Sequence, residues 1–136
     1  MKRKVAVVGC SGIGKTLGAA AREAAFVLAE DLRPGKTQVV ALGLLVLGDE
    51  ETRRAVSGGP AIAIDGCKLG CAAKGLESAG AGVVRKIGVF DVIRRHRGLK
   101  PEGVSDLNED GLRLARAVGE EAAKIVEELA SEDENA

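Results

Sequence analysis

Short apolar segments alternate along the chain with longer segments in which apolar residues recur at every third or fourth position. The short segments are rich in Val, Ile, Leu and Ala and are bounded by Gly, Pro or charged residues, a pattern typical of strands. They cover residues 4–8, 37–42, 61–64 and 82–89. The hydrophobic pattern therefore predicts β-strands that alternate with α-helices.

The longer segments predict helices of different lengths. Residues 14–30 and 68–79 are rich in Ala and carry apolar side chains at helical spacing. A shorter helix is expected to open at the acidic residues 49–52, because negative charge stabilises the amino terminus of a helix. The last helix is expected to begin at a cap within residues 105–108 and to run to about Leu129.

Strands separated by helices predict an α/β fold, with a single doubly wound, mainly parallel four-stranded sheet and helices on both of its faces. The simplest strand order with right-handed connections is 2-1-3-4. The first and third strands are then neighbours, and the crevice beyond their carboxyl ends is the expected ligand position. We expect one domain over residues 1–130, a basic loop at residues 91–104 and an acidic, disordered tail at residues 131–136.

The composition agrees with one small domain and gives no reason to expect a membrane or nucleic acid as a partner. The chain has 136 residues, of which 46% are apolar and only 1% aromatic, so its core must consist of Ala, Val, Ile and Leu. Lys plus Arg equals Asp plus Glu at 20 each, so no net charge draws the protein to a membrane or to nucleic acid. The first apolar stretch is too short for a signal peptide or a membrane span, and we expect a cytoplasmic protein.

The cysteines are the main candidate functional residues. Cys10 follows the first expected strand, and Cys67 and Cys71 follow the third. If the third helix begins at or just before Cys67, the latter two side chains lie one turn apart on one helix face. Thiols at this spacing suit a metal ion, and zinc is the expected one. Because the two strands are expected to be neighbours, we predict that all three thiols converge on one crevice.

Other interpretations of the thiols stay open. Cys67 and Cys71 have the spacing of a dithiol redox pair that would attack a disulfide or an oxidised substrate. Thiolates together with one other ligand also hold iron–sulfur clusters. Small buried cysteines often serve only to fill a core, which is the simplest interpretation of Cys10 taken alone.

The cysteine motifs are similar to those of a known family. Cys10-Ser11-Gly12 after the first strand, Ile64-Asp65-Gly66-Cys67 and Cys71-Ala72 after the third, and Gly75-Leu76-Glu77-Ser78-Ala79-Gly80 beyond them resemble the DGC-domain family. The resemblance covers about Val5 to Val89 and implies a zinc site, without implying a particular activity.

This chain departs from the family pattern at one position. The family carries a fourth cysteine behind the second strand, whereas residues 41–48 contain no thiol here. Asp65, His96, a water molecule or a partner chain would have to supply the fourth ligand. For Asp65 we favour a hydrogen-bonding role in its own turn, and His96 is expected on an exposed basic loop.

A second motif overlaps the first cysteine. Gly9 to Thr16 matches the P-loop pattern G-x-x-x-x-G-K-[ST] between a strand and a helix. In that alternative Gly14, Lys15 and Thr16 would bind a magnesium nucleotide, with Asp65 near the metal, and the protein would be a small nucleotide-binding protein or NTPase. No base-recognition element is evident in so short a chain. A small anion held near Lys15 beside the metal is an intermediate case.

We therefore predict a metal-binding protein whose thiolates, Cys10, Cys67 and Cys71, hold an ion at the carboxyl ends of the first and third strands. The pattern does not decide whether the protein is an enzyme or what oligomer it forms. The basic stretch over residues 85–100 lacks interleaved aromatic residues, so nucleic acid is not an expected partner.

Overall fold

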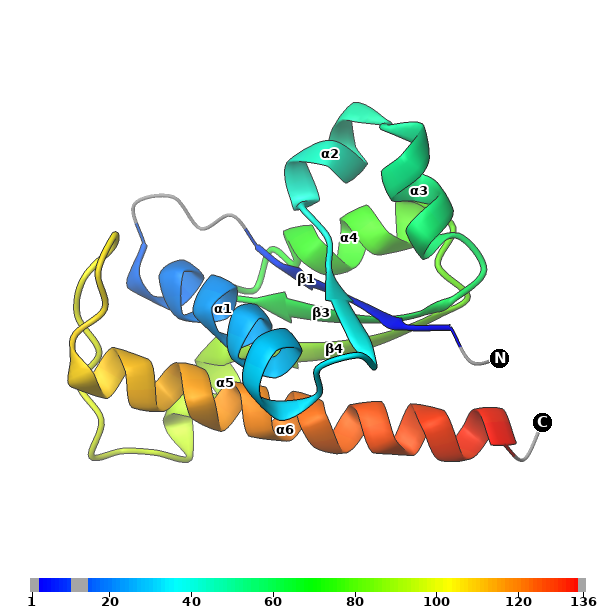
Figure 1. Ribbon diagram of the computed structural model, residues 1–136. Helices are drawn as coiled ribbons and strands as arrows, with labels where there is room; N and C mark the ends of the chain where they lie inside the picture. The colour runs from blue at the N-terminus through cyan, green and yellow to red at the C-terminus, as the bar shows by residue number, and fades with distance from the viewer. Residues whose placement is uncertain (1–2, 11–14, 135–136) are drawn as a thin grey trace.

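A four-stranded parallel sheet forms the centre of the molecule. The computed structural model describes residues 3–10 and 15–134 (Figure 1). The strands are β1 (Val5–Gly9), β2 (Thr37–Val39), β3 (Pro60–Asp65) and β4 (Val83–Gly88). Their order is β2-β1-β3-β4, and all pairs are parallel. The predicted order 2-1-3-4 is confirmed.

Helices cover both faces of this sheet, which confirms the doubly wound α/β architecture (Figure 1). One face carries α1 (Thr16–Phe26), which continues into the π-helical turn η1 (Val27–Leu32), together with α5 (Val89–Arg94) and α6 (Glu109–Glu134). The other face carries α2 (Leu42–Leu47), α3 (Glu50–Val56) and α4 (Cys71–Ser78).

The core consists of small and branched aliphatic side chains, as the composition predicts. The central strands are apolar on both faces: Val7, Val8, Ile62 and Ile64 are all fully buried, as expected for a parallel sheet between two helical layers. The side of α1 that packs on the sheet consists largely of Ala and Gly. Small side chains let this helix lie close to the strands, which brings its amino terminus next to the ends of β1 and β3.

Two short helices were not predicted. The second strand, expected over residues 37–42, ends at Val39, and α2 begins at Leu42, while α5 occupies the start of the segment expected to be a loop. Short apolar runs are compatible with either a strand or a buried helix. Leu-rich residues favour the helix here, and Gly48 ends it in the left-handed region at φ 80°.

The third helix begins later than predicted and the last helix ends later. Helix α4 starts at Cys71 rather than at residue 68, because Gly70 adopts φ 68° and interrupts the helical path before it. The predicted cap of the last helix is confirmed, since Asn108 Oδ1 accepts a hydrogen bond from Gly111 N at 2.8 Å. Helix α6 then extends to Glu134. Among the described residues, no helix is both long enough and apolar enough to cross a membrane.

Candidate metal centre

The carboxyl ends of β1 and β3 bring two of the sequence motifs together. Gly9 pairs with Ile64 in the register of the two strands, and Cys10 N donates a hydrogen bond to Ile64 O at 3.0 Å. Cys10 therefore leaves β1 beside the residues that leave β3. The predicted proximity of the first cysteine to the Asp65-Gly66-Cys67 turn follows directly from the strand order.

The sulfur of Cys10 is held against that turn. Cys10 is buried, and its Sγ accepts a hydrogen bond from Gly66 N at 3.1 Å. Burial raises the pKa of the thiol because it disfavours the charged thiolate, while the Gly66 N–H opposes the rise. Negative charge on Asp65, and on Cys67 and Cys71 whenever they are thiolates, raises the pKa of Cys10 further. These groups are therefore within electrostatic range of the Cys10 sulfur.

Gly66 occupies a position where no side chain fits. A Cβ at this residue would lie 2.7 Å from Gly18 N and 2.8 Å from the carbonyl carbon of Leu17, closer than real Cβ contacts come. Both atoms belong to the backbone of the first turns of α1 and cannot move aside. The turn after β3 thus packs directly on α1, and the glycine is required by this contact.

Asp65 anchors the next helix. Its carboxylate is buried, with Oδ1 accepting a hydrogen bond from Ala72 N at 2.8 Å and Oδ2 accepting one from Ala73 N at 3.2 Å. The negative charge faces the amino terminus of α4, where the helix dipole stabilises it. Asp65 hydrogen-bonds backbone N–H groups, as predicted. These groups lie in α4, seven and eight residues further along the chain, and not in its own turn as expected.

Cys67 and Cys71 flank the turn that leads into α4. Cys67 is half-buried and precedes the helix, whereas Cys71 is exposed and is its first residue. Their predicted placement one turn apart on a single helix face is therefore wrong, because the left-handed Gly70 separates Cys67 from the helix. All three cysteines are free thiols.

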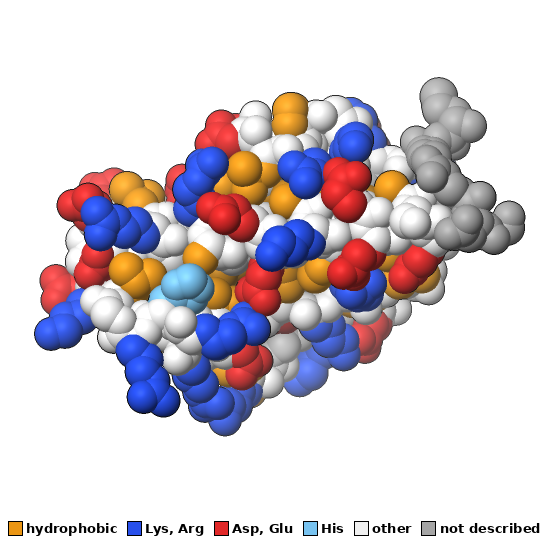
Figure 2. Space-filling view, turned by 90° about the horizontal axis from the view of Figure 1, so that it is seen from below, with side chains coloured by type: hydrophobic (Ala, Val, Ile, Leu, Met, Phe, Trp, Pro, Cys, Tyr) orange, Lys and Arg blue, Asp and Glu red, His pale blue; other side chains and the backbone are white. Residues whose placement is uncertain are grey.

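The three thiols lie at one edge of the sheet but do not form a closed set of ligands. Within the part of the chain that the structure describes, no three side chains of His, Cys, Asp or Glu are arranged to hold a metal ion. His96 is exposed on the segment after α5. Helix α5 itself packs against α6 and α1. Figure 2 shows this side of the molecule, with the histidine at the surface near Lys and Arg side chains and with both signs of charge interspersed.

Comparison with known proteins decides the family. A family model of the DGC domain matches residues 6–111, which is most of the chain. The protein belongs to the DGC domain family. The match includes both cysteine turns and confirms the resemblance seen in the sequence. No curated protein and no solved structure matches this DGC domain.

The segment behind β2, where the resemblance led us to expect a fourth cysteine, forms α2. This helix begins soon after β2 and packs on α4, where a Cβ on Gly75 would lie 2.6 Å from Leu42 Cδ1. This DGC domain thus covers the outer side of α4 with aliphatic side chains of α2.

The residues of the alternative P-loop are only partly described. Gly14 lies outside the described residues, Lys15 is exposed immediately before α1, and Thr16 is the first residue of that helix. Both oxygens of Asp65 accept hydrogen bonds from α4, so this carboxylate is committed to the helix rather than free for magnesium. Nucleotide binding stays a prediction, and the hydrogen bonding of Asp65 argues against its role as a magnesium ligand in that alternative.

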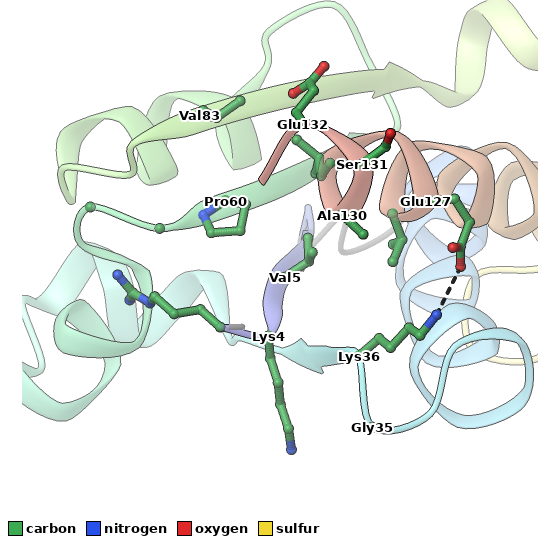
Figure 3. Close-up of a pocket in the computed structure, with 15 residues that line it drawn as sticks. Lys4, Val5, Gly35, Lys36, Pro60, Val83, Glu127, Ala130, Ser131 and Glu132 are labelled. Carbon is green, nitrogen blue, oxygen red and sulfur yellow. Dashed lines mark hydrogen bonds and ion pairs between the residues drawn. The ribbon is translucent and has the colours of Figure 1, made fainter. Parts of the chain in front are cut away.

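A hollow of about 720 Å³ lies at the opposite, amino-terminal edge of the sheet. Figure 3 shows it between the starts of the strands and the last turns of α6, with Lys36 directed at Glu127. Lys36 Nζ lies 3.3 Å from Glu127 Oε1, and Arg3 donates to backbone carbonyls of Ser57, Arg54 and Ala55. Because these cations already have partners in the protein, we place the candidate functional site at the cysteine edge.

Proposed function

We propose that this DGC domain binds a metal ion through the thiolates of Cys10, Cys67 and Cys71, and that the ion is zinc. The observation that supports this proposal is the hydrogen bond from Gly66 N to Cys10 Sγ, which fixes the sulfur of the β1 turn against the backbone that carries Cys67. Sulfur ligands in this number are chemically suited to zinc, which binds thiolates at about 2.3 Å.

Binding would require rearrangement of one short segment. Asp65 and Gly66 are fixed by α4 and α1, whereas residues 67–70 form a turn with exposed or half-buried side chains. A shift of this turn toward Cys10 would bring the Cys67 sulfur closer without disturbing the sheet, whereas the Cys71 sulfur would have to approach from the first residue of α4. Metal binding also displaces the thiol protons, so the positive ion would replace the proton that burial favours on Cys10.

A fourth ligand would come from outside the cysteine set. Asp65 already accepts two backbone hydrogen bonds, and His96 lies on the segment beyond α5. A water molecule or a partner chain would then supply the fourth ligand. A position filled by water is the arrangement that catalytic zinc sites use to activate water or to bind a substrate.

Free thiols suit a reducing compartment, and we expect the protein in the cytoplasm.

Metal stoichiometry tests this proposal directly. Protein purified anaerobically, without chelator or an affinity metal, is analysed by inductively coupled plasma mass spectrometry. We expect about one zinc per chain in the wild type and a large loss in Cys67→Ser. Lys68→Ala is the matched control, because Lys68 is exposed in the same turn and has no ligand atom for zinc at neutral pH. Absence of metal from the wild type, or equal metal in Cys67→Ser, would contradict the proposal.

The same samples distinguish the alternatives. Iron with sulfide in place of zinc would indicate a cluster. A reversible Cys67–Cys71 disulfide with little bound metal would indicate a dithiol redox protein. Binding of ATP or GTP that Lys15→Ala abolishes and Cys67→Ser preserves would indicate the P-loop function, and binding of inorganic phosphate alone would indicate a small anion site near Lys15.

A further inference from the structure

Helix α2 is apolar on every side although it lies at the surface. Residues 41–48 contain only Ala, Leu, Gly and Val. Leu45 is buried and Leu42 packs on α4, so this side of the helix belongs to the core. Leu44, Val46 and Leu47 are 44%, 74% and 82% exposed. A helix that is hydrophobic all round is normally buried, so the outer side of α2 lacks a cover within the described part of the chain.

The outer side of α2 also leaves room for a close neighbour. A Cβ at Gly43 or at Gly48 would meet no atom within 4 Å. In Figure 1, α2 and α3 lie beyond α4 as the outermost elements on their side of the sheet. A second helix can therefore approach α2 without displacing any described part of the protein.

The charged residues next to this apolar surface are arranged so that those of one copy can pair with those of a second copy. Helix α3 has Glu50 and Glu51 in its first turn and Arg53 and Arg54 in its last. The Glu50 and Arg54 side chains are 87% and 82% exposed, and they form a 3.7 Å ion pair within the helix. A two-fold axis beside α2 would make the α3 helices of the two copies antiparallel. The acidic end of each α3 would then face the basic end of the other.

We infer that two copies of this chain associate through α2, burying Leu44, Val46 and Leu47 of each copy, with the α3 charges paired across the interface. The partner is a second copy because a surface with an acidic and a basic end in sequence is complementary to itself under two-fold symmetry. The equal numbers of positive and negative residues, 20 each, mean that no net repulsion opposes association of identical chains.

Sedimentation velocity of the full chain over a concentration series tests this inference. We expect a dimer for the wild type and a monomer for Leu47→Glu, whose side chain is mostly exposed and not needed for folding. Leu112→Glu is the control, because Leu112 is a 48% exposed leucine on α6 over the other face of the sheet. A wild-type monomer at concentrations on the order of 100 µM, or a dimer that Leu47→Glu leaves intact, would overturn the inference.

Exchange of charges examines the two-fold arrangement. The double variants Glu50→Arg/Glu51→Arg and Arg53→Glu/Arg54→Glu each place like charges opposite one another, so each alone should dimerise more weakly than the wild type. An equimolar mixture should restore a dimer, because opposite charges then face each other. Far-ultraviolet circular dichroism confirms that each variant is folded. Failure of the mixture to associate while the wild type is a dimer would overturn the proposed pairing of α3.

Discussion

The N–H of Gly66 donates a hydrogen bond to Sγ of Cys10 at 3.1 Å, across a sequence separation of 56 residues. This contact joins the turn after β1 to the turn after β3. It uses the backbone of the middle residue of the motif Asp65-Gly66-Cys67, so the residue before it is free to hold α4 and the residue after it to carry a thiol. The two turns therefore act as one structural unit at the carboxyl edge of the sheet.

Replacement of Gly66 by alanine should destabilise the protein. The new Cβ would lie 2.7 Å from Gly18 N, and relief of this contact requires displacement of α1 or of the turn. We expect a loss of about 1–3 kcal/mol in the free energy of unfolding, measured by urea denaturation. Gly98→Ala is the control, since a Cβ there meets nothing within 4 Å. Equal stability of the Gly66→Ala protein and the wild type would show that the turn does not pack on α1 as described.

Loss of the Asp65 carboxylate should loosen α4. Asp65→Ala leaves the buried N–H groups of Ala72 and Ala73 without their acceptor and should cost about 1–2 kcal/mol of unfolding free energy. Asp65→Asn keeps one acceptor oxygen and should cost less. Chemical denaturation measures both variants, and Asp110→Asn, in the first turn of α6, is a comparison at a more exposed helix start.

Metal content of the same Asp65 variants separates the capping role from a ligand role. If Asp65 only anchors α4, folded Asp65→Asn keeps the metal content of the wild type. A folded Asp65→Asn protein that has lost its metal would instead identify this carboxylate as the fourth ligand.

The three thiols should react at different rates in metal-free protein. Cys71 is exposed and Cys67 half-buried, whereas Cys10 is buried and its pKa is raised by burial. Because the thiolate is the reactive form, iodoacetamide should modify Cys71 first, Cys67 next and Cys10 last. Peptide mass spectrometry over a time course gives the order. Bound zinc should protect all three, and rapid modification of Cys10 would contradict its burial.

Acid should weaken a contact between α6 and the turn before β2. Hydrogen bonds from Lys36 and Arg33 lower the pKa of Glu127 in the folded protein. The stabilisation is therefore present above the ordinary glutamate pKa and is lost as pH falls through the lowered value. Glu127→Gln should flatten the acid side of the stability curve, measured by thermal unfolding between neutral pH and about pH 3. Glu120→Gln, whose partner Arg116 lies on the same helix, should change this slope less.

Long-range features of the fold were predictable because they follow from strong patterns. The runs around Val7, Ile62 and Ile87 are unmistakable strands, and right-handed connections leave few ways to order them. That order places Cys10 beside the Asp65-Gly66-Cys67 turn. The composition also indicated correctly that aliphatic side chains would form the core.

Features that depend on local backbone geometry were not predictable. The start of α4 is set by the left-handed Gly70 and by hydrogen bonds from Ala72 and Ala73 to a carboxylate seven or more residues earlier, a separation that no local capping pattern contains. Contact between Gly66 and Gly18 joins distant segments, and Gly18 stands within an ordinary helical pattern. Helices of six residues, such as α2 and α5, are too short to show a period.

Asp65 and Gly66 also determine how far an event at the cysteines can spread. Asp65 is hydrogen-bonded to the first turn of α4 on one side of the sheet, and Gly66 packs on α1 on the other. Because residues 67–70 follow directly from these two anchored residues, a ligand that draws Cys67 toward Cys10 also pulls on both contacts, even if only this turn moves. Binding of a ligand at this edge should therefore affect both helical layers. Amide hydrogen exchange should slow in the first turns of α1 and α4, while the strands between them keep their positions.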